Sequence, residues 1–411
     1  MELYDFQKET VKELLGKKRI AVVMTGGGKT AIAMSWLKQK CNYTGKRRVL
    51  IVTTATKAKS GDMEEEAKLW NGADWISTLI SFEVVSWHKL KKWVEAHDKT
   101  LGNYVVVADE IQKIRGYTTG MGASFRRIAR ATQDWSGYTA TPGDKWIDFM
   151  PYFVVTGLIK NKTFFMNRYC RVSTMKGFPE ILGYSREDEL ERGWRIIASI
   201  PDTTSVAEQL PPNRHLDIHF NAPADYRKVY KTRMTLEGEL IENPMSMCHY
   251  LRQLCFTKEK QAWLSDFIEG LGANCIFFCN YKEEEDKVCE IAKKVLPKGA
   301  RVWRIDGGHK EIPTRETIGK NDIVVAHYAS GGEALNLQFM HYWVAVSPNY
   351  SNILNTQAEG RIKRIGQDHA MTFYHLKTDK TIEADIYKCL ANKKEFSEKT
   401  WYAENFTDEN K

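Results

Sequence analysis

A glycine-rich turn near the start of the chain has the residue types that bind phosphate. Residues 25–30 read Thr-Gly-Gly-Gly-Lys-Thr, after an apolar run and before a helical pattern. A strand, a glycine turn and a helix in this order direct backbone N–H groups and a helix N-terminus at an anion. We expect Lys29 to reach the β- and γ-phosphates of a nucleotide and the Thr30 hydroxyl to hold Mg²⁺. The alternative is a glycine turn with a solvated lysine, because Val23 replaces the first glycine of the longer phosphate-loop pattern.

A glutamine precedes this turn in the segment 3–7, Leu-Tyr-Asp-Phe-Gln. The Gln7 side chain has a donor and an acceptor, which suit the edge of adenine. The alternative is an exposed glutamine at the start of a helix. The residues expected to bind ATP are Gln7, Thr25, Gly26, Gly27, Gly28, Lys29 and Thr30.

Two adjacent carboxylates follow the β-branched run 104–108. Asp109 and Glu110 stand at the predicted end of this buried strand, 80 positions after Lys29. We assign Asp109 to Mg²⁺, and Glu110 to the general base that accepts the proton of the attacking water. The alternative is a pair of acidic residues that face solvent at a strand end.

Hydroxyl side chains mark the predicted ends of further strands. Thr53, Thr54 and Ser86 follow apolar runs, and ligands of parallel sheets bind outside the carboxyl ends of the strands. We expect these three to contact the phosphates of DNA, although each is also a common helix cap. Thr139 and Thr141 end another strand and are placed to bond back to the carboxylate pair.

Two arginines in the second half lie three positions apart in a basic segment. Arg361 and Arg364 lie in the segment 357–367, Gln-Ala-Glu-Gly-Arg-Ile-Lys-Arg-Ile-Gly-Gln, and their spacing of three predicts a shared helix face. A guanidinium group that stabilises a transferring γ-phosphoryl group is worth roughly 10³–10⁵ in rate. The alternative is a basic helix without a catalytic partner. Ser330 and Gly331, at the end of another apolar run, are expected to cradle a phosphate of DNA.

The composition is that of an ordinary globular chain with a mild basic excess. The 411 residues are 43% hydrophobic and carry a formal charge of +8, which permits nucleic-acid binding without requiring it. The eight cysteines form no C-x-x-C pair and no zinc spacing, so we expect free thiols in a reducing cytosol. No apolar stretch reaches the roughly 18 residues of a membrane span, and no signal peptide is seen. We therefore expect a cytoplasmic protein of a bacterium or a phage-infected cell, with no membrane contact, acting as a monomer.

Strands alternate with helices along most of the chain, which predicts α/β architecture with parallel sheets and right-handed crossovers. Two such runs are separated by the segment 144–253, which carries no phosphate motif. We expect a first lobe over residues 1–205, with a C-terminal helical extension, and a second over 206–411, with an N-terminal helical extension. The spacing of basic and apolar residues predicts a helix over 225–240.

The order of these motifs resembles that of superfamily 2 helicases, most of all the Swi/Snf branch that tracks along double-stranded DNA. The matching stretches are the Gln7 segment, 25–30, 53–54, 109–112, 139–142 and 357–367. The resemblance implies two RecA-like lobes, with Arg361 and Arg364 directed at ATP bound to the first lobe. The sequence departs from the family at Ala334, where glycine is common, and at 347–350, where remodellers have Trp-Asn-Pro. The residues expected to couple the motifs are Gln112, Thr139, Thr141 and Gln357.

The sequence therefore predicts a DNA-dependent ATPase that uses ATP and Mg²⁺ to move along double-stranded DNA. A strand-separating DNA or RNA helicase is one alternative. A non-catalytic, ATP-dependent clamp on nucleic acid or on a protein is another, which intact Lys29, Glu110, Arg361 and Arg364 disfavour.

Overall fold

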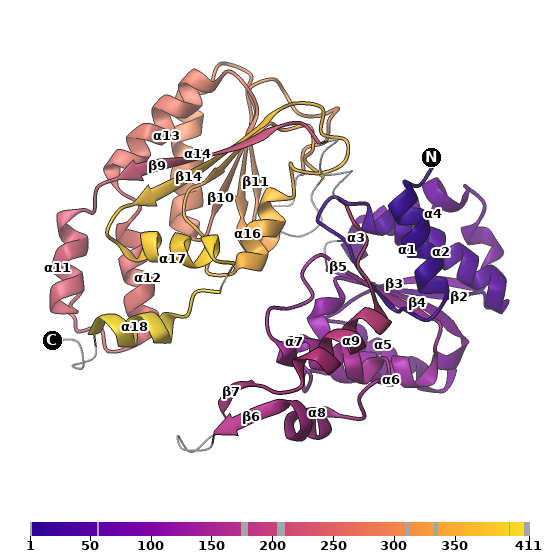
Figure 1. Ribbon diagram of the computed structural model, residues 1–411. Coiled ribbons are helices and arrows are strands. Elements are labelled where there is room, and N and C mark those ends of the chain that lie inside the picture. Colours follow the sequence, from indigo (N-terminus) through magenta and orange to yellow (C-terminus); the bar gives the residue numbers. More distant parts are fainter. Residues whose placement is uncertain are drawn as a thin grey trace. The chain divides into compact units, whose positions relative to one another are not determined.

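The computed structural model describes residues 2–55, 57–173, 180–203, 210–308, 312–331, 336–393 and 395–406. Internal contacts divide the chain into two compact units, Met1–Ala207 and Glu208–Lys411, and each unit has its own sheet (Figure 1). Within the described ranges, no helix is both long enough and apolar enough to cross a membrane.

The first unit contains a six-stranded parallel sheet in the order β3-β2-β4-β5-β1-β8. Its strands are β1 (Ile20–Val22), β2 (Arg48–Thr53), β3 (Ser81–Ser86), β4 (Tyr104–Asp109), β5 (Trp135–Thr139) and β8 (Ala198–Ser199). Its α-helices are α1 (Asp5–Leu15), α2 (Lys29–Thr44), α3 (Lys57–Ser60), α4 (Asp62–Asn71), α5 (Leu90–His97), α6 (Gly120–Ala131), α7 (Trp146–Val155), α8 (Lys162–Tyr169) and α9 (Glu187–Ile197). The described part of this unit also contains three 3₁₀ segments: η1 (Ile76–Thr78), η2 (Asp98–Asn103) and η3 (Ile111–Arg115).

Helices cover both faces of this sheet, which explains why its strands are nearly continuous apolar runs. In β2, Leu50 and Val52 pack in one apolar cluster, and Val49 and Ile51 pack in the cluster on the opposite face. The first cluster includes residues of α5, α6, α7 and α9, and the second includes residues of α1, α2 and α4. Side chains of a strand alternate between faces, so the sheet has an apolar core on each side.

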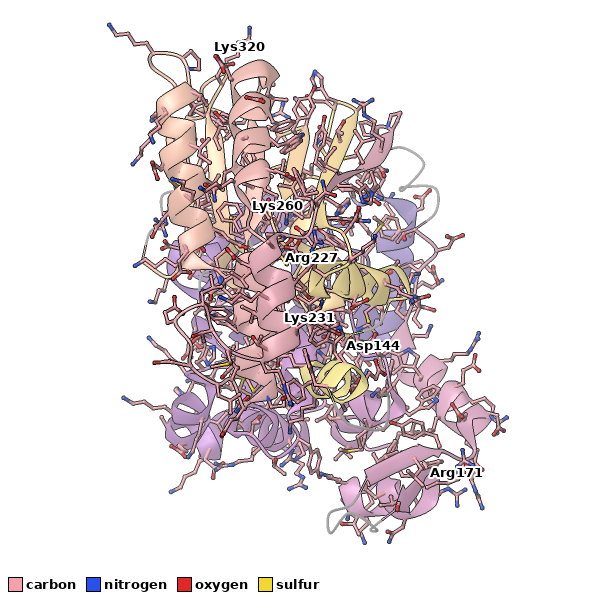
Figure 2. The ribbon with its side chains drawn as sticks, turned by 90° about the vertical axis from the view of Figure 1, so that its left-hand side faces the viewer. Asp144, Arg171, Arg227, Lys231, Lys260 and Lys320 are labelled. Atoms are coloured by element: carbon pink, nitrogen blue, oxygen red, sulfur yellow. The ribbon has the colours of Figure 1, made fainter. Side chains whose placement is uncertain are left out.

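A separate antiparallel hairpin of the first unit joins β6 (Cys170–Ser173) to β7 (Glu180–Tyr184). Figure 2 labels Arg171 on this hairpin. The guanidinium of Arg171 lies across Gly183, where an added Cβ would approach Nη2 to 2.6 Å.

The second unit repeats the parallel architecture, in the order β11-β12-β10-β13-β14-β9. Its strands are β9 (Asn213–Phe220), β10 (Cys275–Cys279), β11 (Val302–Ile305), β12 (Ile323–His327), β13 (Tyr342–Ala345) and β14 (Met371–Thr378). Its helices are α11 (Ala224–Thr232), α12 (Pro244–Leu254), α13 (Lys258–Leu271), α14 (Lys282–Val295), α15 (Tyr328–Gly331), α16 (Asn352–Glu359), α17 (Ile382–Ala391) and α18 (Glu398–Phe406). The prediction of two RecA-like α/β lobes with parallel sheets is confirmed by these two sheets.

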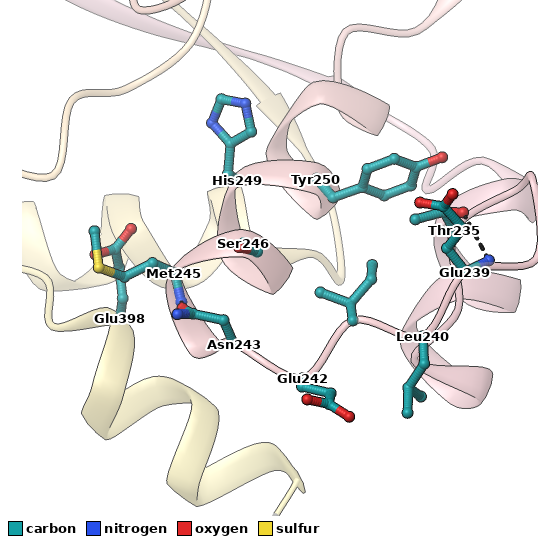
Figure 3. Close-up of a pocket in the computed structure, with 11 residues that line it drawn as sticks. Thr235, Glu239, Leu240, Glu242, Asn243, Met245, Ser246, His249, Tyr250 and Glu398 are labelled. Atoms are coloured by element: carbon teal, nitrogen blue, oxygen red, sulfur yellow. Dashed lines mark hydrogen bonds between the residues drawn. The ribbon is translucent and has the colours of Figure 1, made fainter.

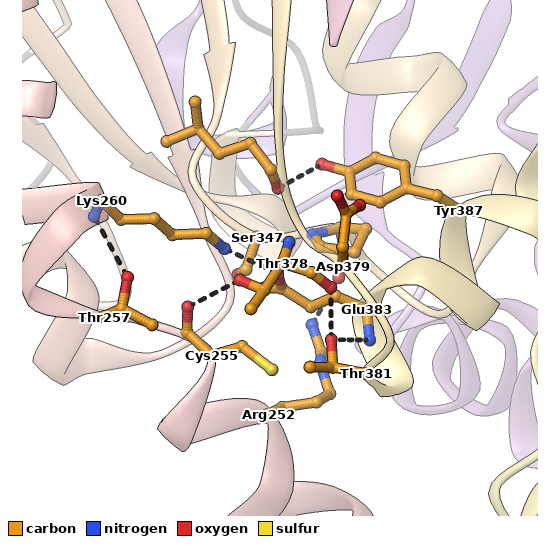
Figure 4. A network of polar contacts seen from close by, with 12 residues as sticks. Arg252, Cys255, Thr257, Lys260, Ser347, Thr378, Asp379, Thr381, Glu383 and Tyr387 are labelled. Carbon is orange, nitrogen blue, oxygen red and sulfur yellow. Dashed lines mark hydrogen bonds and ion pairs between the residues drawn. The ribbon is translucent and has the colours of Figure 1, made fainter. Parts of the chain in front are cut away.

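A buried ion pair joins three elements of the second unit. The ammonium of Lys260, on α13, lies 2.6 Å from a carboxylate oxygen of Glu383, on α17, and their side chains are 0% and 1% exposed (Figure 4). The same oxygen of Glu383 accepts a hydrogen bond from the backbone N–H of Thr378, at the end of β14. Arg227 and Lys231, by contrast, are exposed on α11 (Figure 2).

Two local predictions differ from the structure. The helix predicted over 225–240 is shorter, because α11 ends at Thr232 and Met234 then pairs with Leu240 in an antiparallel bridge. Arg233 has φ +55° at the end of the helix, and this left-handed conformation stops it. Strand β9 was not predicted, because exposed polar side chains such as Arg214, His215 and Asp217 interrupt its apolar residues.

Candidate nucleotide-binding site

The glycine turn connects β1 to α2, as the sequence predicts. Gly26 and Gly28 have φ angles of +81° and +78°, which side chains other than glycine rarely adopt. An added Cβ at Gly28 would lie 2.3 Å from Nε2 of Gln7, so this position has no room for a side chain. Gly28 precedes α2 and has no side chain that could cap it, so the first N–H groups of the helix are directed at the turn.

Gln7 is buried behind this turn, where its side chain is 2% exposed. Its amide Nε2 donates to the carbonyl of Gly27 at 3.1 Å, and its Oε1 accepts from the backbone N–H of Tyr4 at 3.0 Å. In this structure Gln7 therefore holds the glycine turn, and its predicted contact with adenine stays a prediction.

Lys29 and Thr30 are the first two residues of α2, and both are half-buried. The Lys29 ammonium lies 3.4 Å from the carbonyl oxygen of Val23 and 3.5 Å from that of Met24. These are long contacts to the backbone of the turn itself. The lysine side chain therefore folds over the turn in which we expect phosphate.

Asp109, at the end of β4, is a buried carboxylate with two partners on one oxygen. Its Oδ2 accepts from the Thr53 hydroxyl at 2.8 Å and lies 2.9 Å from the ammonium of Lys57, on α3. Burial raises the pKa of Asp109, but Lys57 and the Thr53 hydrogen bond outweigh burial, so the net pKa lies below its usual value. This carboxylate is therefore ionised at neutral pH, as a magnesium ligand must be.

Glu110 follows in a left-handed backbone conformation, with φ +52°. A non-glycine residue in this region is uncommon, and such strain concentrates at functional sites. Its Oε2 accepts from Nε2 of Gln112 at 2.6 Å. Asp109 is buried whereas Glu110 is half-buried, so the two adjacent carboxylates have different environments.

The carboxyl end of β5 supports the same region. Oγ1 of Thr139 accepts from the backbone N–H of Thr141 at 3.0 Å, and the carbonyl of Thr139 accepts from the N–H of Val23 at 2.9 Å. The second contact ties the end of β5 to the start of the glycine turn. The predicted bond from Thr139 to the carboxylate pair is not among these contacts.

Three polar atoms at this edge of the sheet are buried and have no hydrogen-bond partner in the described part of the chain. They are Oγ1 of Thr25, Oε1 of Gln112 and Oγ1 of Thr141. They follow β1, β4 and β5, which are neighbours in the sheet. Buried polar groups without partners are costly, so their gathering here fits a site for a polar ligand. The residue types present also fit ATP with Mg²⁺.

The predicted DNA contacts of the first unit are buried. Thr53, Thr54 and Ser86 are 0%, 4% and 5% exposed. The Thr53 hydroxyl donates to Asp109 in this structure, and the DNA contacts of these three residues stay predictions. Ser330 and Gly331 end the short helix α15, their side chains lie outside the described residues, and Gly332 lies outside them as well.

Arg361 and Arg364 do not share a helix face, contrary to the sequence prediction. Helix α16 ends at Glu359 with Gly360 as its cap, and residues 361–366 form turns and bends. Nε of Arg361 donates to the carbonyl of Gln357 at 3.0 Å, and Arg364 donates to Oδ1 of Asn336. The two arginines are therefore held by α16 and by Asn336 within the second unit.

The family departure at 347–350 has a structural role in the second unit. The Ser347 hydroxyl donates to buried Glu284 at 2.8 Å, and the carbonyl of Pro348 accepts from Arg252. Asn349 donates to Asn280 at 2.7 Å. A polar network therefore holds this segment within the second unit.

A hollow in the second unit lies beside α12 and α18 (Figure 3). Its lining includes Leu240, Glu242, Met245, His249 and Glu398. None of the residues that line it belongs to the predicted site.

Lys57 is a functional candidate that the sequence prediction missed. Its ion pair joins residues 52 positions apart, and no motif spacing relates them. The signal available in the sequence was only a lysine a few residues after the hydroxyl-rich end of β2.

Comparison with known proteins gives two matches of the same class. No family model matches the chain. A stretch of 81 residues is 35% identical to the uncharacterized ATP-dependent helicase YqhH of Bacillus subtilis (strain 168), and covers 20% of this chain and 14% of that protein. Among solved structures, the Sulfolobus solfataricus SWI2/SNF2 ATPase core in complex with dsDNA matches with a TM-score of 0.42 and 16% identity, over 95% of this chain and 91% of that one.

Proposed function

We propose that this protein is an ATPase that is stimulated by DNA and moves along the double helix as it hydrolyses ATP. One observation supports it most. The glycine turn, Asp109, Glu110 and three buried polar atoms that have no hydrogen-bond partner among the described residues gather at the carboxyl edge of one parallel sheet. Ligands of such sheets bind at this edge.

In this proposal, the residues of the first unit bind the nucleotide and activate water. The N–H groups of the glycine turn and the Lys29 ammonium bind the phosphates, and Thr30 and Asp109 hold Mg²⁺. Bound Mg²⁺ would neutralise charge on the phosphate oxygens. Glu110 accepts the proton of the attacking water, and Gln112 orients the Glu110 carboxylate through the hydrogen bond between them.

Arg361 and Arg364 are proposed to stabilise the charge on the transferring phosphoryl group. This role requires that the second unit closes on the nucleotide, so hydrolysis would then control opening and closing. Alternate grip on the phosphate backbone would give directional movement. The proposal for duplex DNA follows from the resemblance to the Swi/Snf branch and agrees with the formal charge of +8.

ATP turnover tests the proposal when it is measured without polymer and with single-stranded DNA, duplex DNA or RNA. We expect the strongest stimulation with duplex DNA. Glu110→Gln should lower turnover about 10²–10⁴-fold, because general-base catalysis contributes that much. Lys29→Ala should abolish turnover, while Lys59→Ala, at an exposed lysine of α3, should leave it unchanged.

The other outcomes of this assay identify the alternatives. Stimulation by RNA alone would contradict the DNA assignment. No turnover under any condition would favour a non-catalytic clamp. If duplex DNA stimulates turnover, displacement of the third strand of a DNA triplex would distinguish movement along the duplex from binding alone.

A further inference from the structure

The hollow beside α12 and α18 combines apolar and acidic side chains (Figure 3). Its volume is about 660 Å³, and the described residues that line it include three carboxylates and no lysine or arginine. The carboxylates belong to Glu239, Glu242 and Glu398. Negative groups therefore gather here on a chain whose formal charge is +8.

Large apolar side chains are exposed to solvent at the same place. Leu240 and Met245, which line the hollow, are 62% and 57% exposed. The two residues that flank Thr235 of the lining, Met234 and Leu236, are 40% and 38% exposed. A single exposed apolar side chain is ordinary, but four within one short segment indicate an interaction surface.

One wall of the hollow is a short hairpin over residues 233–241, which is ordered by its own hydrogen bonds. An antiparallel bridge closes the hairpin. The backbone N–H of Glu239 donates to Oγ1 of Thr235 at 3.2 Å, and the N–H of Leu236 donates to the Tyr250 hydroxyl of α12 at 3.1 Å (Figure 3). A surface that is already held in place loses little conformational entropy when a partner binds.

The charge of the hollow selects the kind of partner. Its carboxylates would repel the phosphates of nucleic acid and attract ammonium or guanidinium groups. Arg233 and Lys399 are near it in the sequence, but neither lines it. The exposed apolar side chains require that the same partner also presents an apolar surface.

We propose that this hollow docks a basic amphipathic helix of a partner protein. Such a helix carries an apolar stripe with lysine or arginine beside it, which matches apolar side chains and carboxylates that lie side by side. A small ligand inside the hollow would leave Leu240 and Met245 exposed, whereas a helix that crosses it would cover both. Methionine is flexible and adapts to the partner's side chains.

Binding of a synthetic peptide to the full-length protein tests the proposal. The probe is a fluorescent peptide of about 18 leucine and lysine residues with the leucines at helical spacing, and anisotropy is measured at about 0.15 M salt. We expect saturable binding of one peptide per chain. A matched peptide with glutamate in place of each lysine should bind at least about 10-fold more weakly. Neither nucleotide nor DNA is present, so the result does not depend on the proposed ATPase.

Variants of the protein locate the binding site. Leu240→Ser and Glu239→Lys should each weaken binding of the lysine peptide at least about 10-fold. Ile80→Ser, at a side chain of the first unit that is 66% exposed, and Glu269→Lys, at an exposed glutamate of α13, are the matched controls and should bind it unchanged. All four positions are exposed, and circular dichroism would verify that each variant is folded.

Three results would overturn the proposal. They are equal affinity for the two peptides, unchanged binding in both Leu240→Ser and Glu239→Lys, and an equal loss of binding in the control variants. Sedimentation equilibrium without peptide adds a fourth. A dimer that Leu240→Ser dissociates would assign the hollow to a second copy of this chain instead of a basic partner.

Discussion

A lysine–carboxylate ion pair is shielded from solvent in each unit, and the two pairs Lys57–Asp109 and Lys260–Glu383 differ in their exposure and surroundings. Lys260 and Glu383 in the second unit are 0% and 1% exposed, at 2.6 Å. Lys57 and Asp109 in the first unit are 19% and 9% exposed, at 2.9 Å. The Lys260–Glu383 pair is fully buried, whereas the Lys57–Asp109 pair keeps some contact with solvent.

The surroundings of the two pairs explain different roles. Glu383 also accepts from the N–H of Thr378, and Thr381 donates to the carbonyl of Thr378, so the pair fastens α17 to the end of β14 (Figure 4). Asp109 instead stands at the ligand-binding edge of its sheet. Asp109 is buried too, but its partner Lys57 is 19% exposed and the pair stands where ligands of the sheet bind, so we expect this carboxylate to be able to change partners.

The largest effect on stability is expected from Lys260→Met. The substitution leaves the Glu383 carboxylate buried without its cation, which typically costs about 3–5 kcal/mol. Urea unfolding of the full chain measures this loss. Lys258→Met, at an exposed lysine of the same helix, is the control and should change stability little. An equally small effect of both substitutions would contradict a structural role for the pair.

A smaller effect on stability is expected from Lys57→Met, roughly 1–2 kcal/mol, because the pair is partly exposed and Thr53 still bonds Asp109. The substitution should also lower the Mg²⁺ concentration that half-saturates ATP turnover, because Lys57 no longer competes for Oδ2 of Asp109. Titration of turnover with Mg²⁺ checks this, with Lys59→Met as the control. A higher Mg²⁺ requirement would mean that Lys57 assists the site instead.

The smallest expected difference appears in the pH dependence of the Lys57→Met effect. The folded pKa of Asp109 is lowered, so its ion pair contributes stability above the unfolded pKa of about 4 and loses it as the pH falls through the folded value. The difference in unfolding free energy between the two proteins should hold from about pH 5 to pH 8 and shrink below about pH 4. Urea unfolding across this range measures it. A difference that shrinks already between pH 8 and pH 6 would point to another titrating group.

The sequence predicted the parallel sheets well, because buried parallel strands are continuous apolar runs that are visible locally. Strand β4, which ends at Asp109, is an example. The glycine turn before α2 was also visible in the local sequence. The sequence prediction failed where local spacing was misleading. Arg361 and Arg364 have helical spacing, but Gly360 ends the helix before them. Strand β9 has too many exposed polar residues to be recognised by an apolar run.

By itself, the sequence determined the order of motifs, the glycine turn and the strand that ends in two carboxylates. Each depends on residues a few positions apart, so local sterics and side-chain alternation specify it. Tertiary structure decided the partners: Lys57 for Asp109 across 52 positions, Lys260 for Glu383 across 123, and His215 for His375 across 160. Only the pairing of strands and the packing of helices bring such residues together, and no spacing along the chain encodes their approach.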